Sequence, residues 1–197
     1  MGLEFDFDRF RAVVCEAARA AFARARSKHP GEQFYAYALY TTGLFDWVYP
    51  ACNTEEGLRR SAQKYLRQGL GSDVERQALE LRWSPEDWAY QDEGKQAFAG
   101  VNRMLRGMGD KLTGLADKDF GRAVRKLTTC LLEVLQQLDR EGIFGEPDAR
   151  DGYVLNLLMD DQDNDSIVAT ARKVNPPKVV KRLKAELKAV EGWGPPK

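Results

Sequence analysis

The segment QFYAYALYT, residues 33–41, carries an apolar or aromatic residue at almost every position. Successive side chains of a β-strand point to opposite faces, so alternate residues beginning with Phe34 would face one side and those beginning with Tyr35 the other. Both faces of such a strand are apolar, and both must be covered by other parts of the chain. We therefore expect a central strand with packed layers on both sides.

Three further segments predict strands. Residues 45–51 are rich in aromatic and branched side chains and would form a hairpin with the first strand, turning around Gly43. Residues 78–83, ALELRW, alternate apolar and charged side chains, which is typical of a half-buried strand. Residues 152–159, GYVLNLLM, are the last candidate. The sequence thus predicts a small, mainly antiparallel sheet of about four strands.

Helical periodicity accounts for most of the remaining chain. Asn53 followed by Glu56 has the spacing of a capping box, and Ser84 before Pro85 predicts the start of a short helix. A last helix would follow Asn175, with Asn175 as its N-cap and Pro176 at its first position. The other predicted helices span residues 5–27, 54–68, 94–109 and 118–140.

These elements predict an α+β fold in which the small sheet packs against several helices. A length of 197 residues fits one domain, which we place at residues 1–191, with residues 192–197 as a loose C-terminal tail. No stretch approaches the roughly 20 apolar residues that span a bilayer, and the start lacks a signal-peptide pattern. We expect a cytoplasmic protein without a membrane partner. Its three separated cysteines, Cys15, Cys52 and Cys130, fit reduced thiols.

An acidic segment, LLMDDQDNDS at residues 157–166, follows the last strand candidate. With Asp161 as the first position of a calcium loop, Asp163 and Asp165 fall at the third and fifth positions. The sixth and twelfth positions hold Ser166 and Arg172, where an EF-hand needs Gly and Glu. The segment therefore predicts an acidic turn that caps a short helix through Asp165 or Ser166, with Asp161, Asp163 and Asp165 only weak candidates for a metal site.

Catalytic motifs are scarce in this sequence. His29 is the only histidine, and the chain has no CxxC pair and no phosphate-binding GxxxxGK[ST] motif. Carboxylates near helix starts, such as Glu55 and Glu86, are accounted for by capping. The sequence therefore predicts no catalytic residue and no cofactor.

Two other groups of residues are candidates for a binding surface. Aromatic residues gather around the predicted strands, including Trp88 and Tyr90 in the segment SPEDWAY, and could line a ligand groove, although such clusters usually pack in a core. Basic residues gather near the C-terminus, but their helix also carries an apolar face, so most of them would be its solvated side. The 30 basic and 30 acidic residues cancel, so no global field attracts nucleic acid.

Four motifs, FYAYALYTT, NTEEGL, RWSPEDWAY and LLMDDQDNDS, resemble a bacterial family named domain of unknown function 4303. The resemblance extends from the first predicted helix to about Asn175. It implies a cytoplasmic α+β domain and brings no catalytic residues. Proteins of this kind look like the small immunity proteins that neutralise toxins.

Three functions remain open from the sequence. The first is a non-enzymatic protein-binding module, a toxin-neutralising immunity protein, with a partner-binding surface formed by Asp160, Asp161, Asp163, Asp165, Trp88 and Tyr90. The second is a metal-assisted hydrolase or small-ligand-binding protein that uses the 160–165 turn. The third is a nucleic-acid-binding protein that uses the basic C-terminal helix.

Overall fold

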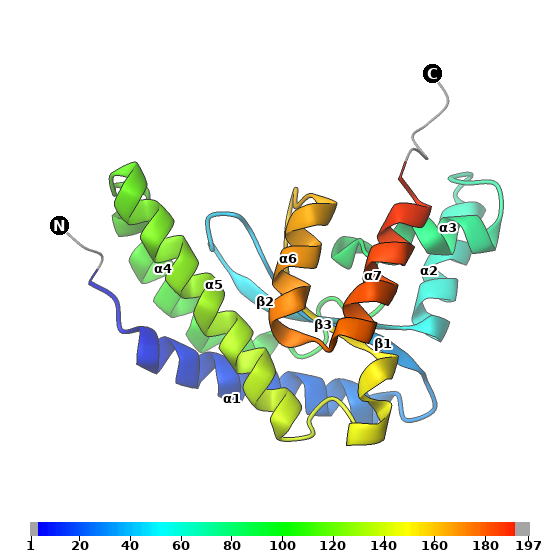
Figure 1. The fold of residues 1–197 in the computed structure, drawn as a ribbon, viewed down its shortest axis with the longest axis horizontal. Helices are drawn as coiled ribbons and strands as arrows, with labels where there is room; N and C mark the ends of the chain where they lie inside the picture. The colour runs from blue at the N-terminus through cyan, green and yellow to red at the C-terminus, as the bar shows by residue number, and fades with distance from the viewer. Residues whose placement is uncertain (1–3, 192–197) are drawn as a thin grey trace.

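The structure, a computed structural model, describes residues 4–191 apart from the side chain of Asp110. The predicted tail at 192–197 lies outside these residues. The chain forms an α+β fold (Figure 1). Its elements are α1 (Phe7–Lys28), β1 (Phe34–Thr41), β2 (Val48–Thr54), α2 (Glu55–Arg67), α3 (Val74–Leu81), α4 (Ala99–Thr113), α5 (Asp117–Arg140), β3 (Val154–Met159), α6 (Asn164–Val174) and α7 (Pro177–Ala189), with 3₁₀ turns at Pro85–Asp87, Lys95–Phe98 and Pro147–Gly152.

The sheet among these residues has three strands in the order β2-β1-β3. β1 and β2 form the predicted antiparallel hairpin, and Leu39 of β1 lies opposite Pro50. β3 pairs with the other edge of β1 in parallel, with Leu39 opposite Leu157. The prediction of a central strand is confirmed, because β1 is paired on both edges and buried along seven of its eight residues. The prediction of about four mainly antiparallel strands is wrong, because the sheet is smaller and mixed.

One face of the sheet packs on α1, α4 and α5. Tyr37 and Leu39 of β1 and Leu155 of β3 join this core. The helices contribute apolar residues that are fully or almost fully buried: Phe10, Val14 and Phe22 from α1, Val101 and Leu105 from α4, and Leu127, Leu131 and Leu135 from α5. Burial of a large apolar side chain contributes about 1.5–3 kcal/mol, so this layer is a main source of stability.

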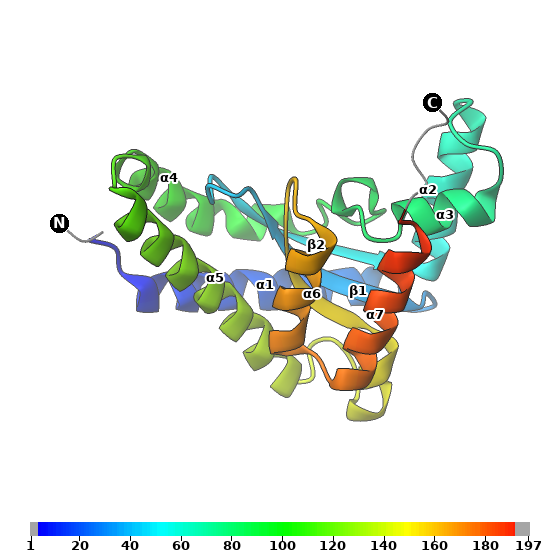
Figure 2. The same ribbon diagram turned by 45° about the horizontal axis from the view of Figure 1, so that its top comes forward.

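The opposite face packs on α2, α6 and α7, and Figure 2 shows α6 and α7 side by side over it. Ala38, Tyr40 and Leu158 enter this second core from the strands. Tyr35 also packs in this second core. Strict alternation along β1 would instead place Tyr35 on the other face of the sheet, beside Tyr37. A β-bulge explains the difference, since the pairing shifts between Phe34 and Ala36 and leaves Tyr35 as the extra residue.

The segment at residues 78–83 is not a strand as predicted. It lies at the end of helix α3. Asp73 accepts a hydrogen bond from the backbone of Arg76 and caps this helix, and Leu79, expected to be buried, is 38% exposed. Val74, Ala78 and Leu81 recur at spacings of four and three, which is the period of a helix. The segment follows this helical period and not the two-residue alternation that predicted a strand.

Two predicted helix caps are also corrected. Thr54, not Asn53, caps α2, because the Thr54 hydroxyl accepts a hydrogen bond from the backbone N–H of Gly57 at 2.8 Å. Asn175 ends α6 and does not cap α7, which begins one residue later than predicted with Pro177.

The Asn175 amide donates to the carbonyl of Leu155 at 2.7 Å, and its oxygen accepts from the backbone N–H of the same residue at 2.9 Å. Asn175 therefore fastens α6 to β3.

Candidate functional site

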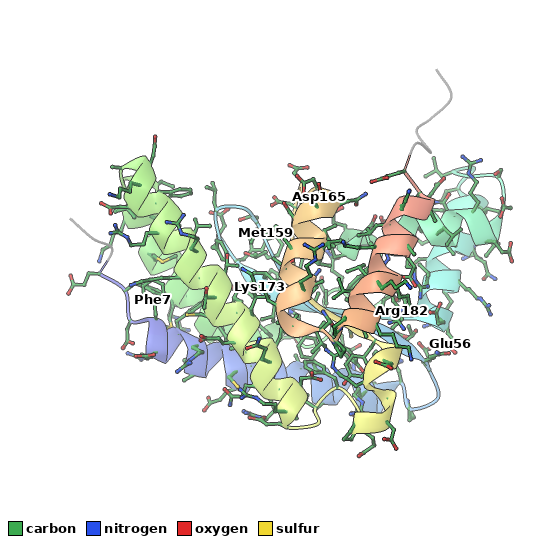
Figure 3. The ribbon with its side chains drawn as sticks, in the orientation of Figure 1. Phe7, Glu56, Met159, Asp165, Lys173 and Arg182 are labelled. Atoms are coloured by element: carbon green, nitrogen blue, oxygen red, sulfur yellow. The ribbon has the colours of Figure 1, made fainter. Side chains whose placement is uncertain are left out.

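The acidic segment lies at one end of the sheet, together with the loop of the hairpin. Because β1 and β3 are parallel, their C-terminal residues Thr41 and Met159 are register partners at the same edge. The chain continues there into residues 42–47 after β1 and residues 160–165 after β3. We call these two segments the acidic end. Figure 3 shows Met159 and Asp165 near each other at this edge.

Hydrogen bonds hold the two segments of the acidic end together. Asp160 Oδ1 accepts from the backbone N–H of Gly43 at 3.0 Å, and the backbone N–H of Asp160 donates to the carbonyl of Thr41 at 3.2 Å. Within the hairpin loop, the Thr42 hydroxyl donates to Asp46 at 2.8 Å. Asp160 therefore has a structural role, and the loops form a defined surface.

The remaining aspartates of the segment have different environments. Asp163 accepts from the backbone N–H of Ser166 at 2.7 Å and caps α6, and this hydrogen bond lowers the pKa of its carboxyl. The capping residue is thus Asp163 and not Asp165 or Ser166. Asp161 is exposed and adopts a left-handed backbone conformation with φ of 54°. Asp165 is exposed in the first turn of α6, where the helix dipole favours a negative charge.

Apolar and aromatic side chains adjoin the acidic end. Leu44, at the hairpin turn, is 48% exposed. Trp47 and Tyr49 are half-buried and stack with ring centroids 5.1 Å apart. The surface therefore combines negative charge with exposed apolar area.

A carboxylate from outside the two segments, that of Glu86, is hydrogen-bonded to the central strand. Glu86 accepts a hydrogen bond from the hydroxyl of Tyr40 at 2.6 Å. Burial raises the pKa of Tyr40, and so do Glu86 and the charges of Asp160 and Asp161. The electrostatic influence of the acidic end therefore extends to a tyrosine of the central strand.

No group of three or more His, Cys, Asp or Glu side chains that could hold a metal ion occurs within the described part of the chain. Asp161, Asp163 and Asp165 thus do not converge on one point, and Asp163 is engaged as a helix cap. The metal site stays a prediction for which the geometry offers no ligand set.

The two aromatic residues of the predicted binding surface lie in the interior. Trp88 is 4% exposed, and its indole donates to the carbonyl of Arg82 at 3.0 Å. Tyr90 is 8% exposed, and its hydroxyl donates to Glu32 at 2.6 Å. The structure brings together the aspartates of the prediction but not Trp88 and Tyr90, so the accessible part of that surface is the acidic end.

A polar network surrounds Glu32, and it was not predicted from the sequence. Its carboxylate accepts from the hydroxyls of Thr54 at 2.5 Å and Tyr90 at 2.6 Å, and forms an ion pair with Arg60 at 2.9 Å. Burial acts to raise the pKa of Glu32, but these hydrogen bonds and the Arg60 charge outweigh it, and the pKa is lowered. The donors Thr54, Arg60 and Tyr90 come from β2, α2 and the segment after α3. Because they are far apart in the sequence, no local pattern predicts that they meet.

All three cysteines are free thiols. Cys15 and Cys52 are buried and Cys130 is half-buried, and burial raises the pKa of each thiol. A raised pKa disfavours the reactive thiolate.

The apolar face predicted for the last helix is confirmed, since Val179, Val180, Leu183 and Leu187 of α7 are buried. A groove of about 340 Å³ between α6 and α7 is lined by Arg172, Lys181 and Lys184. Figure 3 labels two other basic residues of these helices, Lys173 on α6 and Arg182 on α7.

Among residues 4–191, no helix has the length and apolar character needed to cross a bilayer. The family described as Domain of unknown function (DUF4303) matches residues 14–176. No curated protein and no solved structure matches the chain.

Proposed function

Because the chain belongs to the DUF4303 family of domains of unknown function, we propose its function from its surface: it is a protein-binding domain that receives a partner at the acidic end. The observation that carries this proposal is the pairing of exposed carboxylates with the exposed Leu44 and the half-buried Trp47, on two loops that hydrogen bonds fix together. Apolar side chains within a charged rim are the usual composition of a specific protein interface.

The partner of this surface carries a complementary positive charge. Asp161 and Asp165 are exposed, and like-charged partners would be rejected while a basic surface would be attracted and oriented. A basic cleft is the substrate-binding surface of nucleases, because it must hold a polyanion. We therefore propose a toxin with a basic cleft as the partner and inhibition of that toxin as the function.

The first experiment is affinity capture of the tagged protein from its native lysate, with mass spectrometry of what remains after a moderate salt wash. A single stoichiometric protein is the expected result. The second measures the affinity of that protein for a variant with Asp161→Asn and Asp165→Lys. We expect about tenfold weaker binding. Most of this loss should be a slower association rate, because surface charges mainly steer the encounter of the two proteins.

The design of the variant follows from the local geometry. Asp161 becomes Asn, which tolerates its left-handed conformation, and Asp163 is left unchanged because it caps α6. The matched control is Glu16→Gln with Glu75→Lys, which changes the net charge by the same amount at two exposed acids on α1 and α3. If the control weakens binding as much as the test variant, the acidic end is not the interface.

The alternative of a metal-assisted hydrolase or small-ligand protein that uses the 160–165 turn has its own test. A ligand that binds only the folded state raises the melting temperature. Addition of Ca²⁺, Mg²⁺ or Mn²⁺ at about 1 mM should raise it if the aspartates bind metal. The protein-binding proposal predicts no such shift.

One observation favours nucleic acid as a second candidate. Arg172, Lys181 and Lys184 line the groove between α6 and α7, and none of them forms an ion pair with another residue in the described ranges. Binding there would lose affinity steeply with salt, because each neutralised phosphate releases a counterion. An oligonucleotide titration at two salt concentrations distinguishes this candidate from a protein partner.

A further inference from the structure

A cavity of about 760 Å³ opens at the end of the sheet opposite the acidic end. Its walls come from the last turn of α1, the loop at residues 29–33, the start of β1 and the segment at residues 144–153. The proposed protein interface does not include these residues. A test of a binding site here is therefore independent of the test of the proposed protein interface.

The apolar wall of this cavity is a cluster of rings around Tyr37. The Tyr37 ring stacks on Phe34 at 5.1 Å between centroids and an interplanar angle of 9°. It also meets Phe144 at 4.9 Å and Tyr153 at 5.6 Å. Such a wall offers apolar and aromatic contact to an organic ligand.

The hydroxyl of Tyr37 is a donor without a partner. Tyr37 is 1% exposed and lines the cavity, and no described residue forms a hydrogen bond with its hydroxyl. By contrast, the hydroxyl of Tyr153 on the same wall donates to Asp139 at 3.1 Å. The Tyr37 hydroxyl is therefore free to donate a hydrogen bond to a ligand that enters the cavity.

Arg26 supplies a positive charge to the same cavity. Its guanidinium lies close enough to act electrostatically on both Tyr37 and Tyr153. One of its amino groups, Nη1, donates to the carbonyl of Ile143 at 2.9 Å, and its other donors remain for a ligand. A neutral hydroxyl and a guanidinium on the walls of one cavity match a carboxylate, which only accepts hydrogen bonds.

Two carboxylates line the same cavity. Glu146 and Asp148 are exposed at the segment that starts the 3₁₀ turn Pro147–Gly152, and neither forms an ion pair with another described residue. They provide the negative charge that an ammonium group requires. The third acid of the lining, Glu32, is already held by Arg60, Thr54 and Tyr90.

We propose that this cavity binds a small zwitterion, an α-amino acid with a large apolar side chain. Arg26 and the Tyr37 hydroxyl hold its carboxylate, Glu146 and Asp148 attract its ammonium group, and the rings of Phe34 and Phe144 pack on its side chain. His29 lies beside this site with its Nε2 buried and without a hydrogen bond, 3.6 Å from Glu93.

The test is isothermal titration with three probes that share a phenyl ring. L-Phenylalanine carries both charges, 3-phenylpropionate lacks the ammonium group and phenethylamine lacks the carboxylate. We expect L-phenylalanine to bind about tenfold or more tightly than either of the others, because each loses one charge-assisted contact. Equal binding of phenethylamine, or no binding of any probe or of L-leucine at about 10 mM, would overturn the proposal.

Variants locate the binding. Tyr37→Phe keeps the ring and removes only the hydroxyl, and should weaken L-phenylalanine about threefold to tenfold. Asp148→Asn should also weaken it, while Glu75→Gln, the same chemical change on α3, should leave it unchanged. Melting curves confirm that each variant folds. Unchanged affinity in Tyr37→Phe would show that any binding occurs elsewhere and would overturn the site.

Discussion

Tyr35 and Tyr37 lie two residues apart on β1, yet their hydroxyl groups have different surroundings. The Tyr35 hydroxyl donates to the carbonyl of Arg82 at 2.9 Å and accepts from the amide of Asn53 at 2.9 Å. The Tyr37 hydroxyl has no partner among the described residues. The β-bulge at Tyr35 causes this difference, because it turns Tyr35 to the opposite face of the sheet.

This difference predicts unequal effects of the same substitution. Tyr35→Phe leaves Asn53 and a carbonyl without their partner and should lower the free energy of unfolding by about 1–3 kcal/mol. Tyr37→Phe removes an unpaired hydroxyl and should change it by less than about 0.5 kcal/mol. Urea unfolding of both variants measures the two values. A loss in Tyr37→Phe equal to that in Tyr35→Phe would mean that Tyr37 has a partner in the folded protein.

Asp163 and Asp165 provide a second comparison at the residue scale. Asp163 caps α6 through Ser166, whereas Asp165 accepts no such bond. Asp163→Ala should lower the melting temperature by about 2–4 °C, and Asp163→Asn should restore most of it because Asn is also a good N-cap. Asp165→Ala serves as the control and should have a smaller effect. A larger loss in Asp165→Ala would contradict the assignment of the cap.

At the scale of elements, Arg82 joins three helices. It lies at the end of α3, its guanidinium donates to both carboxylate oxygens of Glu55 on α2 at 2.9 and 2.6 Å, and its Nε is 3.3 Å from Glu186 on α7. The Arg82 side chain is 15% exposed, and its Cζ atom lies 4.2 Å from the centroid of the Tyr35 ring.

Removal of this cation should destabilise the packing of the three helices. Arg82→Gln leaves two carboxylates close together without their partner, and we expect a loss of about 2–3 kcal/mol, below the 3–5 kcal/mol of a fully buried pair because Glu55 is 35% exposed. Arg82→Lys should retain only part of this stability, because Lys lacks the planar guanidinium that binds a carboxylate through two hydrogen bonds. A double-mutant cycle with Glu55→Gln measures the coupling. A coupling near zero would show that the pair is not formed in solution.

The Glu32 network joins β2, α2 and the loop before β1, and it predicts a pH dependence. The pKa of Glu32 lies below its ordinary value of 4.5, so the folded state binds fewer protons than the unfolded state near that pH. Its stabilising contribution is complete above 4.5 and is lost as the pH falls below 4.5 through the folded pKa. Glu32→Gln should therefore lower stability at neutral pH and reduce the slope of stability against pH below 4.5.

This pH effect is measured as the difference between the two proteins, because other carboxyl groups with lowered pKa values, such as Glu93, titrate in both. Glu93 and its partner Lys28 are unchanged in the variant. Parallel curves of stability against pH for the two proteins would contradict the lowered pKa of Glu32.

The elements that the sequence predicted well are those with a strong local signal. The hairpin, the long helix α5 and the central position of β1 follow from periodicity and from apolar residues on both faces of one strand. The segment 78–83 was mistaken for a strand because an alternation over six residues also fits the end of a helix. The parallel direction of β3 depends on where the chain runs between β2 and β3, and its residues do not encode that path.

The candidate sites were predictable to a similar extent. The aspartates of the 160–165 turn stand together in the sequence, so their grouping was visible there, but their juxtaposition with the hairpin loop follows from the parallel pairing. Trp88 and Tyr90 are buried because the segment after α3 folds back over the sheet, which composition does not reveal. The cavity around Tyr37 combines segments more than 100 residues apart in the chain.

At the scale of the whole molecule, the last helix lies outside the stretch that matches the family. The family match ends at residue 176 and α7 begins at Pro177, yet α7 covers the second face of the sheet with Val179, Val180 and Leu183. Glu186 of α7 also pairs with Arg82. In this chain the second face of the sheet is therefore covered in part by an element beyond the matched stretch.

Removal of this cover should expose the second core. Leu183 is fully buried, and Leu183→Ala should lower the free energy of unfolding by about 2–5 kcal/mol, whereas the exposed neighbour change Lys184→Ala should cost less than about 0.5 kcal/mol. A chain that ends at residue 176 should bind a hydrophobic dye and lose its cooperative melting transition, because one face of the sheet then meets water. If that shorter chain melts cooperatively at the temperature of the full chain, α7 is an accessory helix and the matched stretch folds without it.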